Sequence, residues 1–194
     1  ARTAHAQAPA DEQPALLALQ LMPQMPEAEL IVQSHLRAKP HGAAMRTVYA
    51  QALTSAHRYP EAIAELTAVI RNDPRATTPW LRLAAAQLEE KQASEAKAVL
   101  LQFLERLKDG RITPSTATAS APDDDTATDT PTATDTSETL AHLLLAKAAE
   151  LQRDYSGANA WLDKINDPQR ALYVATRRAA ITATTSTISA GVTG

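Results

Sequence analysis

The side chains that most often bind metals are present in this chain, but their spacing does not build a site. Histidine ligands usually recur within a few residues of one another or beside cysteines. The chain has 0 cysteines, and its 5 histidines are scattered along it: His5, His35, His41, His57 and His142. The sequence therefore predicts no metal site, and it predicts that these histidines lie at the surface or in turns.

Nucleophiles and carboxylates give no better indication of catalysis. Serines occur in expected turns and in a polar stretch, without the G-x-S-x-G pattern that exposes a nucleophile. An acid–base pair needs burial that separates two pKa values, whereas Glu65, Glu89, Glu90 and Glu105 fall on helix faces expected to be solvated. The run Asp123 to Asp125 lacks the glycine of an EF-hand loop. We predict that the chain is not an enzyme and needs no cofactor.

Composition points to helices packed on helices. Of the 194 residues, 44% are hydrophobic but only 4% are aromatic, and there are 5 glycines. Alternating patterns typical of strands are nearly absent. The net charge is −3 with no block of lysine or arginine, so we predict no nucleic-acid partner. No apolar run approaches the roughly 18–20 residues that cross a bilayer, so we predict no membrane span.

The stretch 46–74 carries the clearest helical pattern. Apolar residues recur at the spacing of two helices with one buried face each: Val48, Tyr49, Ala52 and Leu53, then Ala62, Ile63, Leu66, Val69 and Ile70. Pro60 suits the first turn of the second helix, where its missing N–H costs nothing. Asp73 precedes Pro74 and is therefore steered away from helical geometry. The stretch predicts a helical hairpin.

The same hairpin recurs at a fixed step. Ala28, Ala62 and Ala96 lie 34 residues apart, and so do Pro40 and Pro74. A helical hairpin of that period resembles the tetratricopeptide repeat family. Trp80 falls where the family's tryptophan usually sits, which implies a core position. Trp161 lies among leucines too, but next to Leu162, and its role stays open between core and ligand stacking.

The resemblance predicts an all-α, right-handed solenoid of antiparallel hairpins, interrupted by a disordered insertion rich in Thr and Asp. The predicted segments are a flexible N-terminus (1–10), repeats within 11–109 (11–40, 43–74 and 77–108), the insertion (110–136), a further hairpin and half repeat (137–181) and a disordered tail (182–194). Thr78 is expected to cap the third repeat, with Pro79 as its first helical residue.

In similar proteins the first helix of each hairpin lines a concave groove that binds a peptide. Matching that pattern places these candidates in the groove: Thr47, Gln51, Thr54, Ser55, Leu81, Ala85, Leu88, Glu89, Leu143, Lys147 and Glu150. Some family members hold a C-terminal carboxylate with a clamp of lysine, asparagine and arginine. Its matching places hold Thr47, Gln51, Leu81 and Ala85 here, so that clamp is absent.

The first hypothesis is a non-catalytic scaffold that binds a protein or peptide partner in the groove. The alternative is a truncated structural fragment of a larger repeat protein, whose apolar face around Leu172 and Val174 docks on further repeats or self-associates. The segment from Leu21 to Glu27 resembles part of longer bacterial cell-envelope proteins with this repeat. The A-x-A pattern at Ala4 to Ala8 agrees with export, so periplasm or envelope is favoured over cytoplasm.

Overall fold

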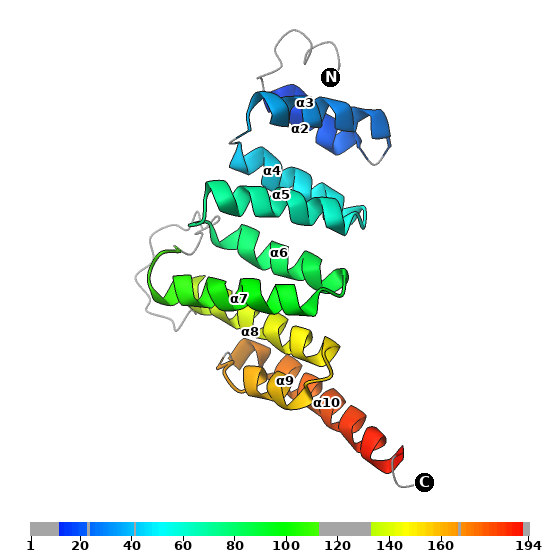
Figure 1. Cartoon of the computed structure of the whole chain (residues 1–194), viewed down its shortest axis with the longest axis vertical. Helices are drawn as coiled ribbons and strands as arrows, with labels where there is room; N and C mark the ends of the chain where they lie inside the picture. Colours follow the sequence, from blue (N-terminus) through cyan, green and yellow to red (C-terminus); the bar gives the residue numbers. More distant parts are fainter. Residues whose placement is uncertain (1–11, 23, 41, 113–132, 167, 192–194) are drawn as a thin grey trace. The chain divides into compact units, whose positions relative to one another are not determined.

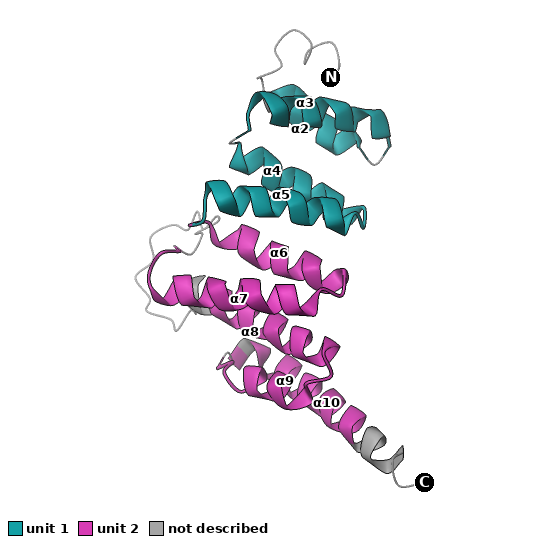
Figure 2. Cartoon of the chain, in the orientation of Figure 1, with its two compact units in different colours: residues 1–74 teal, residues 75–194 magenta. Residues whose placement is uncertain are grey.

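The described residues fold into helices, most of which are joined by short turns (Figure 1). The computed structural model describes residues 12–22, 24–40, 42–112, 133–166 and 168–191, and these contain no β-strand. The all-α prediction is confirmed. The predicted flexible N-terminus and the greater part of the predicted insertion lie outside the described residues. The chain divides into two compact units, residues 1–74 and 75–194 (Figure 2). Each unit is described by itself.

The first unit consists of two helical hairpins. Its elements are α2 (Glu12–Leu21), the 3-10 turn η1 (Pro26–Ala28), α3 (Glu29–Ala38), α4 (Ala43–Ser55) and α5 (Tyr59–Asn72). Pro60 lies in the first turn of α5, and Asp73 follows its last residue, as predicted. Val32, Leu53 and Ala62 are fully buried in a shared core.

One apolar residue of this unit does not face the core. Val48 is 44% exposed, whereas its neighbour Tyr49 is 3% exposed. Successive residues of a helix point about 100° apart, so only one of two adjacent apolar side chains can face a narrow contact. The prediction that Val48 is buried was therefore wrong, while the burial of Tyr49 and Leu53 is confirmed.

The second unit contains the longest of the described helices. They are α6 (Thr77–Glu89), α7 (Ala93–Lys108), α8 (Ala133–Leu151), α9 (Tyr155–Leu162), the 3-10 turn η2 (Pro168–Arg170) and α10 (Ala171–Gly191). Consecutive helices pack against one another, and α6 also contacts α8. Trp80 is 3% exposed and is covered by the Arg106 guanidinium, 5.4 Å from the ring centre. Its predicted core position is confirmed.

Three helix ends differ from the prediction. Helix α6 begins at Thr77 with Ala76 as its N-cap and no side-chain cap, so Thr78 is not the capping residue. Helix α8 begins at Ala133, inside the predicted insertion, and α10 continues to Gly191 instead of ending near Ile181.

The Thr-rich end of α10 is helical, and its hydroxyl groups bond to the backbone of the same helix. The Oγ1 atoms of Thr182 and Thr184 donate to carbonyls four residues earlier, each at 2.9 Å. Such bonds satisfy the hydroxyls within the helix, but they tend to bend it slightly. The composition that predicted a disordered tail is therefore compatible with helix.

The turn inside each regular hairpin has one conformation. His57, Lys91 and Arg153 have φ angles of 57°, 60° and 61°, in the left-handed region. The following amide closes the turn on a carbonyl five residues earlier: Arg58 N to Leu53 O at 2.9 Å, Gln92 N to Gln87 O at 2.8 Å and Asp154 N to Ala149 O at 2.9 Å. This is the Schellman motif, which usually places glycine at the left-handed position.

Replacing Lys91 by glycine is expected to stabilise the chain. An L side chain in the left-handed region costs roughly 1–2 kcal/mol, and glycine removes this cost. Part of the gain is lost because glycine also increases the conformational entropy of the unfolded chain. We expect Lys91→Gly to raise the free energy of unfolding by about 0.5–1 kcal/mol in urea titrations. Lys91→Ala keeps the strain and is the control; an equal gain in both variants would contradict this explanation.

Candidate functional site

The structure brings together groove candidates from two helices of the second unit. Lys147 Nζ on α8 donates to Glu89 Oε1 on α6 at 2.7 Å. The Lys147 and Glu89 side chains remain 41% and 48% exposed. Helices α6 and α8 are first helices of their hairpins, so the pair joins the faces that the repeat pattern assigned to the groove.

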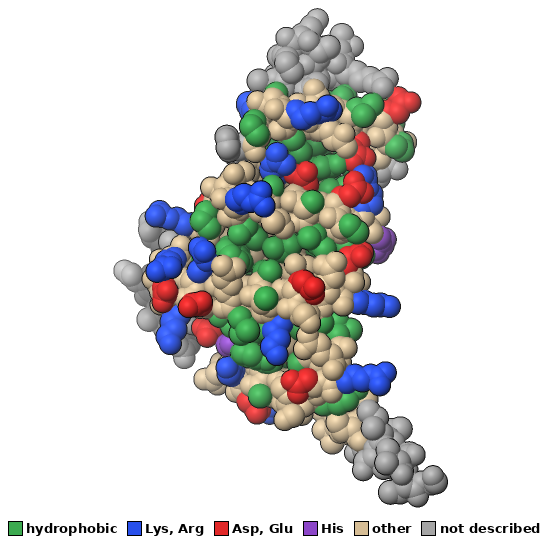
Figure 3. All heavy atoms as spheres, in the orientation of Figure 1, with side chains coloured by type: hydrophobic (Ala, Val, Ile, Leu, Met, Phe, Trp, Pro, Cys, Tyr) green, Lys and Arg blue, Asp and Glu red, His purple; other side chains and the backbone are tan. Residues whose placement is uncertain are grey.

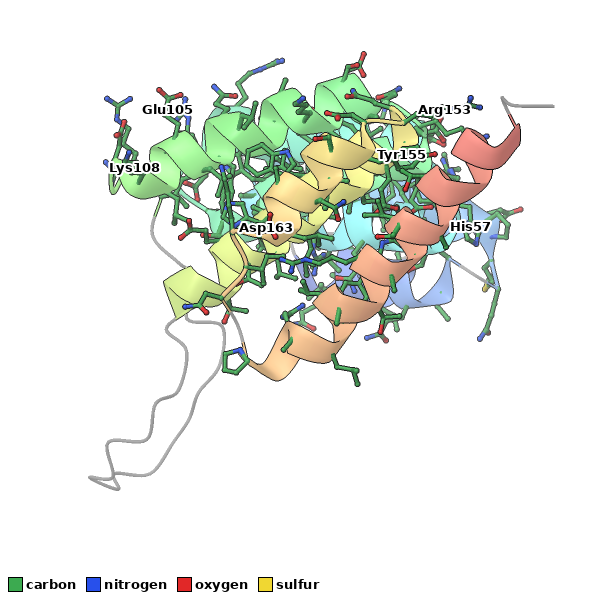
Figure 4. The ribbon with its side chains drawn as sticks, turned by 90° about the horizontal axis from the view of Figure 1, so that it is seen from below. His57, Glu105, Lys108, Arg153, Tyr155 and Asp163 are labelled. Carbon is green, nitrogen blue, oxygen red and sulfur yellow. The ribbon has the colours of Figure 1, made fainter. Side chains whose placement is uncertain are left out.

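Helix α10 also contacts α8. Arg177 of α10 donates to Glu150 Oε2 of α8 at 2.7 Å. A second pair joins Arg178 of α10 to Asp163, the residue that follows α9. Val174 and Ile181 pack into the core that α8 and α9 share. Seen from below, α10 runs beside this hairpin, with Asp163 labelled (Figure 4).

A pocket of about 250 Å³ lies among α8, α9 and α10. Its lining combines apolar side chains with two cations: Leu143, Leu144, Ala146, Lys147, Leu162, Tyr173 and Arg177. Leu143 and Lys147 were predicted from the sequence, and the other five were missed. Arg177 had a usable signal, because it lies one repeat step of 34 residues after the candidate Leu143.

One candidate does not face solvent. Leu88 is 2% exposed and packs in the core, so its assignment to the groove was wrong. The helical period places it close to the face that packs against the neighbouring helices. Leu81 and Ala85 on the same helix are half-buried and remain candidates.

The candidates of the first unit lie on α4. The hydroxyls of Thr47, Thr54 and Ser55 donate to carbonyls of their own helix at 2.8, 2.8 and 3.1 Å. Their remaining capacity is as acceptors. Gln51 is exposed on the same helix. A groove at this helix stays a prediction.

Comparison with known protein families supplies the identity of the repeats. The model of the tetratricopeptide repeat matches residues 53–112, which run from the end of α4 through α7. Over this part of the chain, which is less than half of its 194 residues, the sequence is similar to the tetratricopeptide repeat. Repeats of this family generally mediate protein–protein interaction. No curated protein is similar enough to the chain to count as a match.

The helical hairpins of the first unit hold a cluster of paired charges. Glu29 accepts from Arg58 at 2.7 and 2.9 Å and from the Tyr49 hydroxyl at 2.5 Å. These bonds, led by that of Arg58, hold the pKa of Glu29 below its usual value. Burial and the adjacent Glu29 raise the pKa of Tyr49 to about 12. Arg58 also bonds Glu61, so the cluster ties α3 to α4 and α5.

Glu65 was predicted on a solvated face, but its side chain is only 23% exposed and pairs with Arg46. The charged groups of these clusters are thus paired with one another.

In the described part of the chain no group of histidines and carboxylates could hold a metal ion. No described helix is long and apolar enough to cross a membrane. On the face in Figure 3, cationic, anionic and apolar side chains are interspersed.

Two histidines are buried, against the prediction of surface positions. His35 is 2% exposed and His142 is 6% exposed. His57 lies in a turn as predicted, and its Nδ1 is 2.8 Å from the Tyr59 hydroxyl. His5 and His41 are outside the described residues. Burial is reached because His35 and His142 fall at helical positions that face the core.

His142 stacks on Trp161, with ring centres 5.8 Å apart. Lys164 Nζ lies 4.1 Å from the centre of the same indole. Burial lowers the pKa of His142; Glu138 opposes that shift, and Lys164 adds to it. Trp161 therefore packs between helices and is partly exposed, which places it nearer a core role than a ligand-stacking one.

The burial of His142 makes stability depend on pH. In the unfolded chain the imidazole binds a proton as the pH falls through about 6.5, whereas in the fold it stays neutral to lower pH. The free energy of unfolding should therefore be largest above about pH 6.5. It should decrease as the pH falls from there toward the lower pKa that His142 has in the folded chain. In urea titrations, the free energy of unfolding should decrease less between pH 7.5 and pH 5.5 in His142→Gln than in the wild type. An equal loss in both proteins would exclude His142 as the cause.

Proposed function

We propose that this protein binds a segment of a protein partner along the face formed by α6, α8 and α10. The proposal is supported chiefly by the two ion pairs, Lys147 with Glu89 and Arg177 with Glu150, which join three helices beside the pocket. A face built from several helices presents polar and apolar groups at fixed positions, which a bound segment requires. The family to which the repeats belong agrees with a protein partner.

Photo-crosslinking tests which face meets the partner. Benzoylphenylalanine would replace Leu81 on α6, at the proposed face, or Leu101 on α7, which is 42% exposed. Both sites hold leucine, so the inserted side chain changes size equally. In cells that make the protein, we expect a crosslinked product from position 81 and little from 101. Equal products, or a product from 101 alone, would move the interface to another face.

Self-association is a second candidate, favoured by one observation. Leu172 is 82% exposed and Tyr173 is 55% exposed at the start of α10. The predicted apolar face is smaller than the sequence suggested, because Val174 is only 7% exposed and packs against α9. Sedimentation of the wild type and Leu172→Asp distinguishes the two candidates, since a dimer lost in the variant supports this one.

A further inference from the structure

We propose that the partner segment is acidic, with an apolar side chain that enters the pocket among α8, α9 and α10 and side-chain carboxylates beside it that pair with Lys147 and Arg177. This inference rests on the proposed function, because it assumes that a segment binds at that face. It adds the chemistry by which the segment is recognised.

The lining of the pocket indicates both parts of the ligand. A volume of about 250 Å³ suits one large apolar side chain. Leucines from α8 and the half-exposed ring of Tyr173 offer it apolar contact. The two charged residues in the lining, Lys147 and Arg177, are both cations and come from different helices. An apolar group flanked by carboxylates therefore complements the pocket in shape and in charge.

The ion pairs of the free protein show how these cations are satisfied. Lys147 holds Glu89, and Arg177 holds Glu150, each through one nitrogen at 2.7 Å. A lysine has three donors and an arginine five, so each cation can bond a further carboxylate or exchange its present one. The Lys147 and Arg177 side chains are 41% and 37% exposed, within reach of a ligand.

Selection from a random peptide library tests the inference without knowledge of the natural partner. Twelve-residue peptides held at both ends by a carrier protein present no free C-terminal carboxylate. We expect selected peptides to carry Asp or Glu close to Leu, Ile or Phe. Selection of peptides without acidic residues would overturn the inference and leave the proposed function standing. Failure to select any peptide would count against the proposed function itself.

Variants then place the contact on the cations. For a selected peptide we expect Lys147→Ala and Arg177→Ala to weaken binding about three- to tenfold each. Glu89→Gln should strengthen it a few-fold, because the peptide carboxylate no longer competes for Lys147. If the Lys147–Glu89 pair only supported the fold, Glu89→Gln would weaken binding. Weaker binding in this variant would therefore contradict the idea that a peptide carboxylate replaces Glu89 on Lys147.

Arg178→Ala is the matched control, since Arg178 is the next residue on α10 and pairs with Asp163 outside the pocket. It should leave the affinity unchanged. A loss of affinity equal to that of Arg177→Ala would show that α10 supports the fold without contacting the peptide. The selected peptide is also compared as its free acid and its C-terminal amide. Equal affinities are expected, and a preference for the free acid would assign the carboxylate to a chain end instead of a side chain.

Discussion

Replacing Phe103 by alanine is expected to lower the free energy of unfolding by about 3–5 kcal/mol. The ring lies in α7 and is 0% exposed. Its removal takes away buried apolar surface and leaves a cavity that the surrounding helices fill only in part. Urea denaturation followed by circular dichroism measures the change directly.

Leu101→Ala is the matched control for this prediction. Leu101 is on the same helix but is 42% exposed, so its truncation should cost well under half as much. If both variants lost the same stability, the cost would come from the helix and not from the cavity at Phe103.

Replacing Ala96 by leucine is expected to cost about 1–3 kcal/mol, because it overfills a close contact between helices. Ala96 is 0% exposed in the first turn of α7, and α7 packs along α6. The larger side chain must push the pair apart or take a strained rotamer. The midpoint of urea denaturation should fall accordingly.

Ala98→Leu separates this effect from helix propensity. Ala98 is exposed two residues further along α7, where leucine is an acceptable helix former. That variant should keep nearly the wild-type stability. A stable Ala96→Leu would refute the idea that the alanines of the repeat mark points of close packing.

The repeat pattern was predictable because it depends on local features. Ala28 is 7% exposed, and Ala62 and Ala96 are 0% exposed, so the alanines found by sequence spacing do share a packing role. Pro60 and Asp73 fixed the ends of α5 through their own backbone preferences. A helical period combined with such signals needs no knowledge of the distant parts of the chain.

The remaining features depend on which elements meet. Composition alone favoured a surface position for His142 and disorder for the Thr-rich end of α10, whereas His142 is buried and α10 continues to Gly191. Lys147 was a candidate from its place in the repeat, but its partner Glu89 lies 58 residues away. The pocket exists only because α10 docks on α8 and α9, and contacts of that range leave little trace in a single sequence.

The chain between α7 and α8 bears on how the second unit assembles. Helix α7 ends at Lys108, and α8 begins at Ala133, yet the two helices pack together. Closing so long a connection costs about 1–2 kcal/mol more entropy than closing a tight turn. The contact of α7 with α8 is thus the least local one between consecutive helices here. We therefore expect the contact of α7 with α8 to form later in folding than the contacts within each hairpin, which close tight turns.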